Sequence, residues 1–121
     1  MLDLSLYILT AAVLLGLVLA LFYLGILPRR SWIAGAIHAL LAAAGLAILI
    51  LSLGGPARGA EYGVQSFGAI AAVIAAAALL IGLTFAALHI FAKKRVGWLV
   101  GAHVTAGIAA YFFLMAYVVL G

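Results

Sequence analysis

The sequence predicts an all-α integral membrane protein, a four-helix up-and-down bundle that forms a single transmembrane domain over residues 1–121. Of its 121 residues, 71% are hydrophobic and only 7% are charged, whereas about 25% of the residues in a soluble domain are charged. The hydrophobic residues also gather in long stretches, and about 20 residues of helix cross the hydrocarbon core of a bilayer. Because backbone N–H and C=O groups in lipid must form hydrogen bonds with one another, each stretch is predicted to be a helix.

Four apolar stretches meet this length, and mostly short segments separate them. The first lacks the basic start of a signal peptide and carries Asp3 instead, so we interpret it as a retained helix. The longest connection, 54–66, contains glycines and a proline that indicate irregular backbone. The predicted helices are approximately 4–27, 32–53, 67–92 and 98–120.

The few charges predict the orientation in the membrane. Five of the six Lys and Arg residues lie in the loops 28–31 and 93–97, and the positive-inside rule places such loops in the cytoplasm. Both termini are then expected on the non-cytoplasmic side of the cell membrane. The net charge of +4 is read as a topology signal, so we expect the lipid bilayer and no nucleic acid as a partner.

Several function classes are excluded because the chain has no cysteine and its predicted spans have no charged residues. The chain has no cysteine, which excludes disulfide scaffolds and thiolate zinc sites. No Asp, Glu, Lys or Arg lies within the four predicted spans. Exporters driven by an embedded carboxylate and voltage sensors with helical arginines are therefore excluded as well.

Apart from tyrosines, the ionisable side chains inside the spans are the three histidines, His38, His89 and His103. His38 lies eight residues after Arg30, about 12 Å along a helix. His103 follows Arg95 by the same interval, and His89 precedes the second basic loop by four residues. All three imidazoles are predicted to share one layer in the cytoplasmic half of the bilayer.

A shared layer of imidazoles favours one haem b, whose iron takes an imidazole from each face. We predict His38 and His103 as the metal ligands, because the second and fourth helices of such a bundle are diagonal neighbours. His89 would replace one of them or line the site. Small residues would let the ring approach the backbone, and cations would receive its propionates. The further predicted cofactor-binding residues are Gly35, Gly45, Gly107, Arg30 and Arg95.

The same residues have simpler interpretations. Glycine serves close helix packing in any membrane bundle, the cations set topology, and an imidazole can bond a carbonyl or hydroxyl across helices. A pigment-binding subunit with imidazole-ligated chlorophyll, a cofactor-free structural subunit and a small oligomeric transporter therefore stay open. No catalytic residue is predicted.

A short pattern recurs in the second and fourth predicted helices. Segments 32–38 and 98–103 both read Trp, two aliphatic residues, Gly-Ala and then His, with one extra residue in the first copy. This indicates a duplicated two-helix unit, or a chance match in a chain rich in Ala, Gly and Leu.

Taken together, these features resemble the four-helix membrane b-type cytochromes, such as the cytochrome b561 family. The resemblance covers the architecture of the whole chain: short-looped spans, histidines on several helices, small residues facing them and a basic rim. With three histidines, the chain can ligate at most one haem through two histidines, whereas two haems would need four. The resemblance implies electron transfer, alone or as a subunit of a redox complex, with quinone or a partner redox protein. A homo-oligomer is left open.

Overall fold

The structure is a computed structural model and describes residues 1–28 and 31–121. In these residues it is helical, without strands, as predicted. Four helices are long and apolar enough to cross a membrane, which fits a multi-pass membrane protein. They are α1 (Leu2–Tyr23), α2 (Trp32–Ser52), α3 (Phe67–Phe91) and α4 (Gly97–Leu120), with a single 3-10 turn, η1 (Ala60–Tyr62), before α3.

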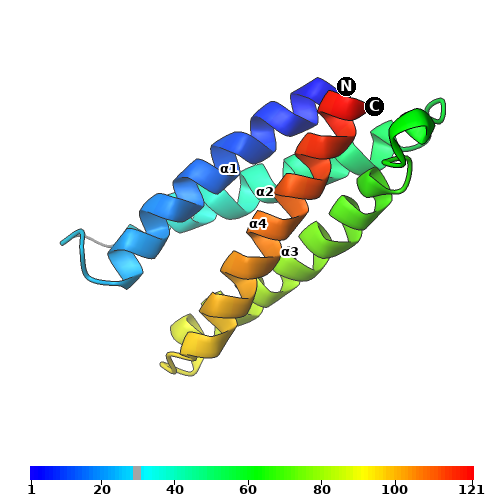
Figure 1. Cartoon of the computed structure of the whole chain (residues 1–121). Coiled ribbons are helices and arrows are strands. Elements are labelled where there is room, and N and C mark those ends of the chain that lie inside the picture. Colours follow the sequence, from blue (N-terminus) through cyan, green and yellow to red (C-terminus); the bar gives the residue numbers. More distant parts are fainter. Residues whose placement is uncertain (29–30) are drawn as a thin grey trace.

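The helices form two hairpins that pack side by side. α1 packs mainly on α2 and α3 on α4, with smaller contacts between α2 and α3 and between α1 and α4. Figure 1 shows both termini and η1 at one end of the bundle, here called the terminal end. Toward the opposite end, here called the loop end, the hairpins diverge.

The bounds of α2, α3 and α4 agree with the predicted ones within one residue, but α1 ends four residues earlier. Gly25 turns the chain through a left-handed conformation with φ 77°. The N–H of Ile26 donates to the Leu21 carbonyl over 3.0 Å, and that of Gly25 donates to Phe22 over 3.2 Å. This Schellman pattern satisfies the last carbonyls of a helix. The longer prediction was wrong because apolar composition alone does not mark the turn.

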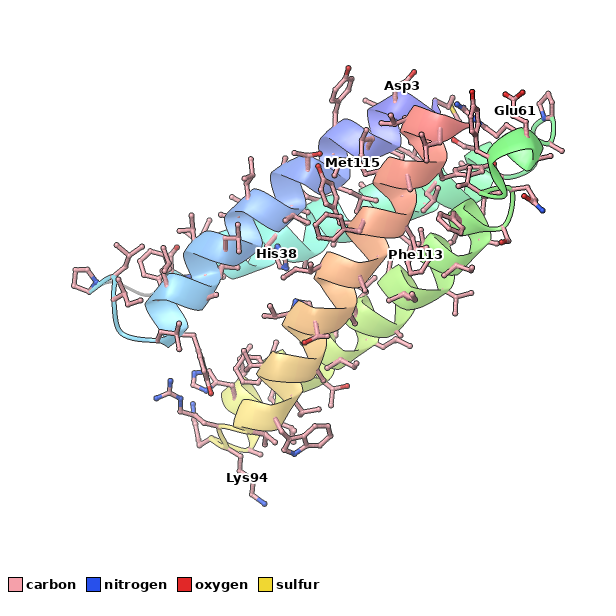
Figure 2. All side chains as sticks on the ribbon, in the orientation of Figure 1. Asp3, His38, Glu61, Lys94, Phe113 and Met115 are labelled. Atoms are coloured by element: carbon pink, nitrogen blue, oxygen red, sulfur yellow. The ribbon has the colours of Figure 1, made fainter. Side chains whose placement is uncertain are left out.

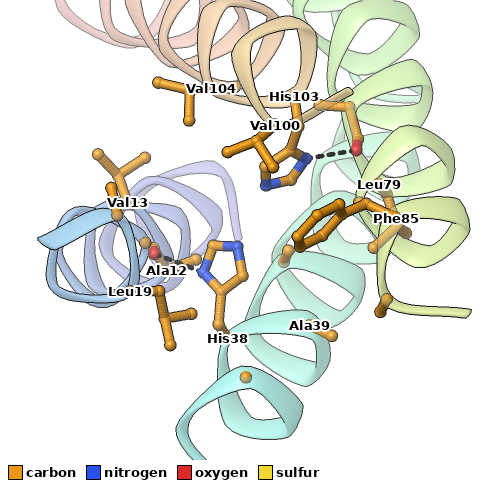
Figure 3. A pocket seen from close by; sticks show the side chains of 18 of the residues that line it. Ala12, Val13, Leu19, His38, Ala39, Leu79, Phe85, Val100, His103 and Val104 are labelled. Carbon is orange, nitrogen blue, oxygen red and sulfur yellow. Dashed lines mark hydrogen bonds between the residues drawn. The ribbon is translucent and has the colours of Figure 1, made fainter. Parts of the chain in front are cut away.

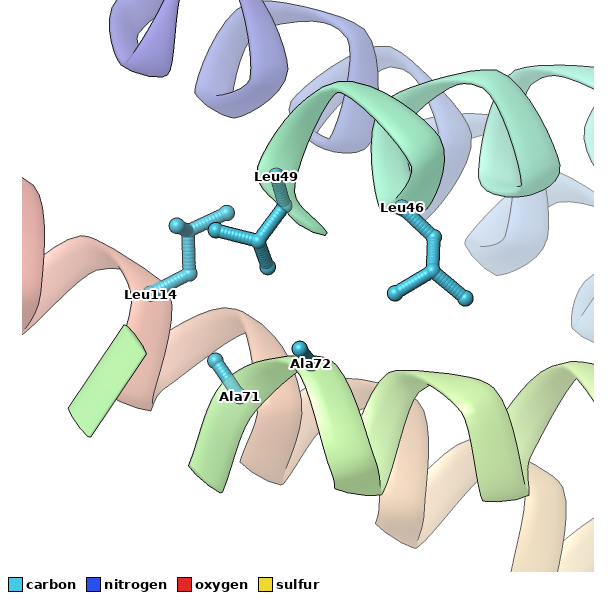
Figure 4. Packing of buried hydrophobic residues seen from close by; sticks show 5 residues of the cluster. All are labelled: Leu46, Leu49, Ala71, Ala72 and Leu114. Atoms are coloured by element: carbon cyan, nitrogen blue, oxygen red, sulfur yellow. The ribbon is translucent and has the colours of Figure 1, made fainter. Parts of the chain in front are cut away.

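The best-packed part of the core lies toward the terminal end. Leucines from α2 and α4 meet two alanines of α3, whose small side chains let the helices approach closely (Figure 4). The buried cluster consists of Leu46, Leu49, Ala71, Ala72 and Leu114. The bundle is therefore closed at its terminal end.

The connection 54–66 folds back onto this end. A terminal nitrogen of Arg58 donates to the Val118 carbonyl over 3.2 Å, and its guanidinium lies 5.6 Å from the centre of the Tyr117 ring. A cation near the last carbonyls of a helix is electrostatically favourable. Asp3 and Glu61 are also at this end, whereas Lys94 lies at the loop end (Figure 2).

Candidate cofactor site

All four helices contribute to a cavity of about 650 Å³ that reaches from the core toward the loop end (Figure 3). This size falls in the range of about 300–1,000 Å³ found for small-molecule and cofactor sites. Most of the lining side chains are Ala, Gly, Val and Leu. The nitrogen-bearing side chains in the lining are His38, His89, His103, Trp32 and Arg95.

Two of the three predicted histidines face each other in this cavity. The rings of His38 on α2 and His103 on α4 have centres 5.8 Å apart and planes 82° apart. Both side chains are half-buried. The prediction paired these two residues on diagonal helices, and the structure brings them together.

Each imidazole is anchored to the other helix of its own hairpin. Nδ1 of His38 lies 2.8 Å from the Ala12 carbonyl oxygen on α1, and Nδ1 of His103 lies 2.7 Å from that of Ala78 on α3. A carbonyl only accepts, so Nδ1 carries the proton and donates in both rings. In the neutral imidazole this leaves the lone pair on Nε2. Neither Nε2 has a hydrogen-bond partner among the described residues.

Two glycines that the sequence interpretation missed make room for the rings. A Cβ added to Gly16 would lie 2.9 Å from Cε1 of His38, and one added to Gly82 would lie 2.8 Å from Cε1 of His103. Each glycine follows the carbonyl acceptor by four residues, one turn along the same face. The repeated Ala-x-x-x-Gly at 12–16 and 78–82 is the signal that could have identified them.

The paired contacts extend the repeat seen in the sequence from α2 and α4 to α1 and α3. Each hairpin has the same carbonyl, glycine and histidine arrangement. Leu49 and Leu114 each follow the histidine of their helix by eleven residues, and both are fully buried. The site therefore lies between two equivalent halves, related by an approximate half-turn about the bundle axis.

His89 does not join the other two imidazoles. It is exposed near the end of α3, where its ring stacks on Phe85 with centres 6.3 Å apart. Phe85 meets the Tyr23 ring edge-on at 6.0 Å, and the Arg95 guanidinium lies 5.1 Å from the centre of that Tyr23 ring. All four side chains line the cavity. These four residues, here called the mouth residues, link the diverging hairpins.

The predicted glycines have different surroundings. Gly35 and Gly107 line the cavity, and a Cβ on either would meet no atom within 4 Å. Gly45 instead lies buried between α1 and α2, where an added Cβ would come within 2.6 Å of Leu9. Its carbonyl accepts a hydrogen bond of 2.8 Å from Ser5, so Gly45 serves helix packing. Arg30 lies outside the described residues.

The two imidazoles of His38 and His103 are suited to a metal ion whose other ligands belong to a bound organic group. An imidazole nitrogen binds a metal ion at about 2 Å, so two rings that ligate one ion have centres about 6 Å apart. The 5.8 Å found here meets this spacing, which is also that of an ordinary edge-to-face ring contact. Among the described residues, no three His, Cys, Asp or Glu side chains gather to hold a metal ion. Two imidazoles alone suit a metal in a macrocycle, such as haem.

Comparison with protein-family models, curated proteins and solved structures finds no match to this chain.

Proposed function

We propose that this chain is a membrane electron-transfer protein, or a subunit of a redox complex, that binds one haem b through His38 and His103. The observation that supports this most is the facing pair of imidazoles, each with Nδ1 anchored to a carbonyl. Histidines that ligate metals almost always donate their other ring nitrogen in this way. When bound, the haem supplies a one-electron iron couple.

The chain's own residues hold and tune the group. The Ala12 and Ala78 carbonyls accept from Nδ1, which leaves the lone pair of each Nε2 available to a metal ion, and they fix the directions in which the rings point. Apolar side chains surround the pair and restrict water, and burial of this kind is one of the factors that set a haem potential.

At the mouth, Arg95 is the described cation that lines the cavity. Asp3 and Glu61 lie at the opposite end of the bundle, so neither acid competes for this guanidinium. We propose that Arg95 binds a carboxylate of the bound group, since guanidinium and carboxylate form charge-assisted hydrogen bonds. His89 lines the same part of the cavity and is not proposed as a ligand.

The proposal includes the sidedness predicted from the charges. The loops 28–31 and 93–97 face the cytoplasm and both termini lie on the other side of the cell membrane. The mouth of the cavity then opens near the cytoplasmic surface, where quinone or a partner redox protein exchanges electrons with the site.

An absorbance spectrum of the purified protein, before and after dithionite, tests the proposal directly. We expect a Soret band and, on reduction, the sharp α-band of a six-coordinate haem b. Protein purified intact after expression with ample haem, yet showing neither band, would overturn the proposal.

Three histidine variants test the choice of ligands. His38→Ala and His103→Ala should each lose the six-coordinate spectrum, because each removes one of the two proposed ligands. His89→Ala serves as the matched control and should retain it. Loss of the spectrum in His89→Ala alone would contradict the assigned pair.

A further inference from the structure

One hydrogen bond joins the two hairpins beside the cavity. The hydroxyl oxygens of Thr10 on α1 and Tyr111 on α4 lie 2.9 Å apart, and Tyr111 lines the cavity. The Thr10 hydroxyl already donates to the Leu6 carbonyl over 2.7 Å, so its single proton is committed and Tyr111 is the donor. Among the described residues, no other hydrogen bond connects a helix of the first hairpin to a helix of the second.

The two halves of the bundle differ at this point. Ala76 on α3 occupies the position equivalent to Thr10, and Leu46 on α2 is equivalent to Tyr111. Leu46 belongs to the buried cluster, and Ala76 packs against that cluster. Apolar side chains therefore suffice to close such a seam, and hydrogen bonds between helices in lipid add only modest stability. What the polar pair adds is direction, because a hydrogen bond prefers a nearly linear geometry.

The relative orientation of the two imidazoles depends on how the hairpins are held together. Each ring is hydrogen-bonded within its own hairpin, His38 to α1 and His103 to α3. The angle of 82° between the ring planes and the 5.8 Å between the ring centres are therefore set by the placement of one hairpin against the other. The Thr10–Tyr111 bond joins α1, which supplies the acceptor for His38, to α4, which carries His103.

We infer that Thr10 and Tyr111 are positioning residues, whose hydrogen bond holds the hairpins so that the imidazole planes of His38 and His103 are nearly perpendicular. The consequence for a bound iron rests on the proposed haem function. In a low-spin ferric haem, the angle between the two axial imidazole planes determines the electron paramagnetic resonance (EPR) spectrum. Nearly perpendicular planes give one dominant signal at a large g value, whereas parallel planes give three separated signals.

EPR of the oxidised, haem-loaded full chain tests this role. We expect the large-g signal for the unmodified protein. Tyr111→Phe and Thr10→Val each remove the bond, and each should shift the spectrum toward three separated signals. Because both changes remove one shared interaction, the double variant should show no further shift. Thr10→Ser keeps the hydroxyl and should retain the large-g signal.

Two control variants remove a hydroxyl elsewhere. Thr84→Val breaks only a bond to the Leu80 carbonyl on its own helix, of the same kind as the bond from Thr10 to Leu6. Tyr7→Phe alters a tyrosine that is 70% exposed. Both should keep the large-g signal. Persistence of that signal in Tyr111→Phe and Thr10→Val, an equal shift in Thr84→Val, or three separated signals in the unmodified protein would each overturn the inference.

A second measurement needs no haem. The chain has no cysteine, so nitroxide labels can be attached to Ile33→Cys on α2 and Phe91→Cys on α3, two exposed positions near the loop end. The distribution of distances between the labels, measured by pulsed EPR in nanodiscs, should broaden in Tyr111→Phe and not in Tyr7→Phe. Broadening in protein without a Soret band would retain the role of the Thr10–Tyr111 bond and reject the haem. A haem spectrum with an unchanged distance distribution in Tyr111→Phe would do the reverse.

Discussion

One turn of the neighbouring helix sets the position of each imidazole in the cavity. The turn supplies a carbonyl that orients the ring and, four residues later, a glycine that leaves space for it. The two requirements are linked, since a side chain at the glycine would push the ring away from the carbonyl. Gly16 and Gly82 are therefore positioning residues for the histidines.

This arrangement predicts that a single added methyl group weakens haem binding at the proposed site. In Gly82→Ala the new Cβ would lie 2.8 Å from Cε1 and 2.9 Å from Nδ1 of His103, so the ring must move and its bond to Ala78 lengthens. Loss of such a supporting bond lowers metal affinity by about 10- to 100-fold. Titration of haem into the apoprotein measures this, and Gly16→Ala should behave alike.

The matched control is Gly101→Ala. This glycine lies on α4 and does not line the cavity, and a Cβ there meets nothing within 4 Å. The same methyl group should leave haem affinity unchanged. Equal weakening by Gly101→Ala and Gly82→Ala would show that helix flexibility, and not the position of the imidazole, controls binding.

At the scale of helices, stability is concentrated toward the terminal end. Lipid chains are as apolar as leucine, so transfer of a side chain from lipid into the bundle contributes little and packing contributes most. Leu49 of α2 and Leu114 of α4 are 0% and 1% exposed and meet the alanines of α3. The diverging helices near the cavity have fewer such contacts.

Truncation of the core should therefore destabilise the bundle. Leu114→Ala leaves an unfilled space in the cluster, and we expect a loss of about 2 kcal/mol, the lower end of the range for buried leucines in water-soluble proteins. Leu49→Ala should have a similar effect. Unfolding in detergent, followed by circular dichroism, measures the change.

Leu51→Ala is the control for this series, because Leu51 lies on the same helix as Leu49 but is 68% exposed. Its truncation should change stability by less than about 0.5 kcal/mol. A large effect of Leu51→Ala would indicate that this face of α2 packs against another subunit.

At the scale of the whole molecule, the described charges are divided between the two ends. Lys93, Lys94 and Arg95 lie beside the mouth of the cavity, whereas Asp3 and Glu61 lie at the terminal end. Among the described cations, Arg58 belongs to the terminal end and is turned inward onto α4. This division is what the proposed orientation depends on.

The absence of native cysteine allows a clean test of that orientation. In intact cells, a membrane-impermeant maleimide should label Ala57→Cys, an exposed position of the connection 54–66, and leave Lys94→Cys unlabelled. Permeabilised cells should show labelling at both positions. The opposite pattern would place the mouth of the cavity on the outer surface and reverse the proposed topology.

Much of the fold could be predicted because length and apolar composition suffice to identify four helices that are long and apolar enough to span a membrane. The end of α1 could not, since residues 24–27 are also apolar apart from Gly25, and only the left-handed turn at Gly25 stops the helix. Depth along the helices grouped His38, His89 and His103, and the diagonal placement of the second and fourth helices selected His38 and His103. Depth does not say which way a side chain points, and His89 lies at the mouth.

The supporting residues of the site were harder to find. Backbone carbonyls carry no sequence signal, so the roles of Ala12 and Ala78 could not be inferred from residue type. Gly16 and Gly82 are two of 14 glycines, and residue type alone does not show which of the 14 lie beside a histidine. Gly45 had the right spacing from His38, yet that face of the helix is covered by α1.

The half-turn that relates the two hairpins has a consequence for any flat ligand between them. Turning the ligand over exchanges its faces between His38 and His103. Some inner positions are identical in the two halves: Ala12 and Ala78, Gly16 and Gly82, and Leu49 and Leu114. Others differ, since Gly35 corresponds to Val100, and Tyr23 at the mouth corresponds to His89. The preference between the two ligand orientations therefore comes from these unequal pairs and not from the two histidines.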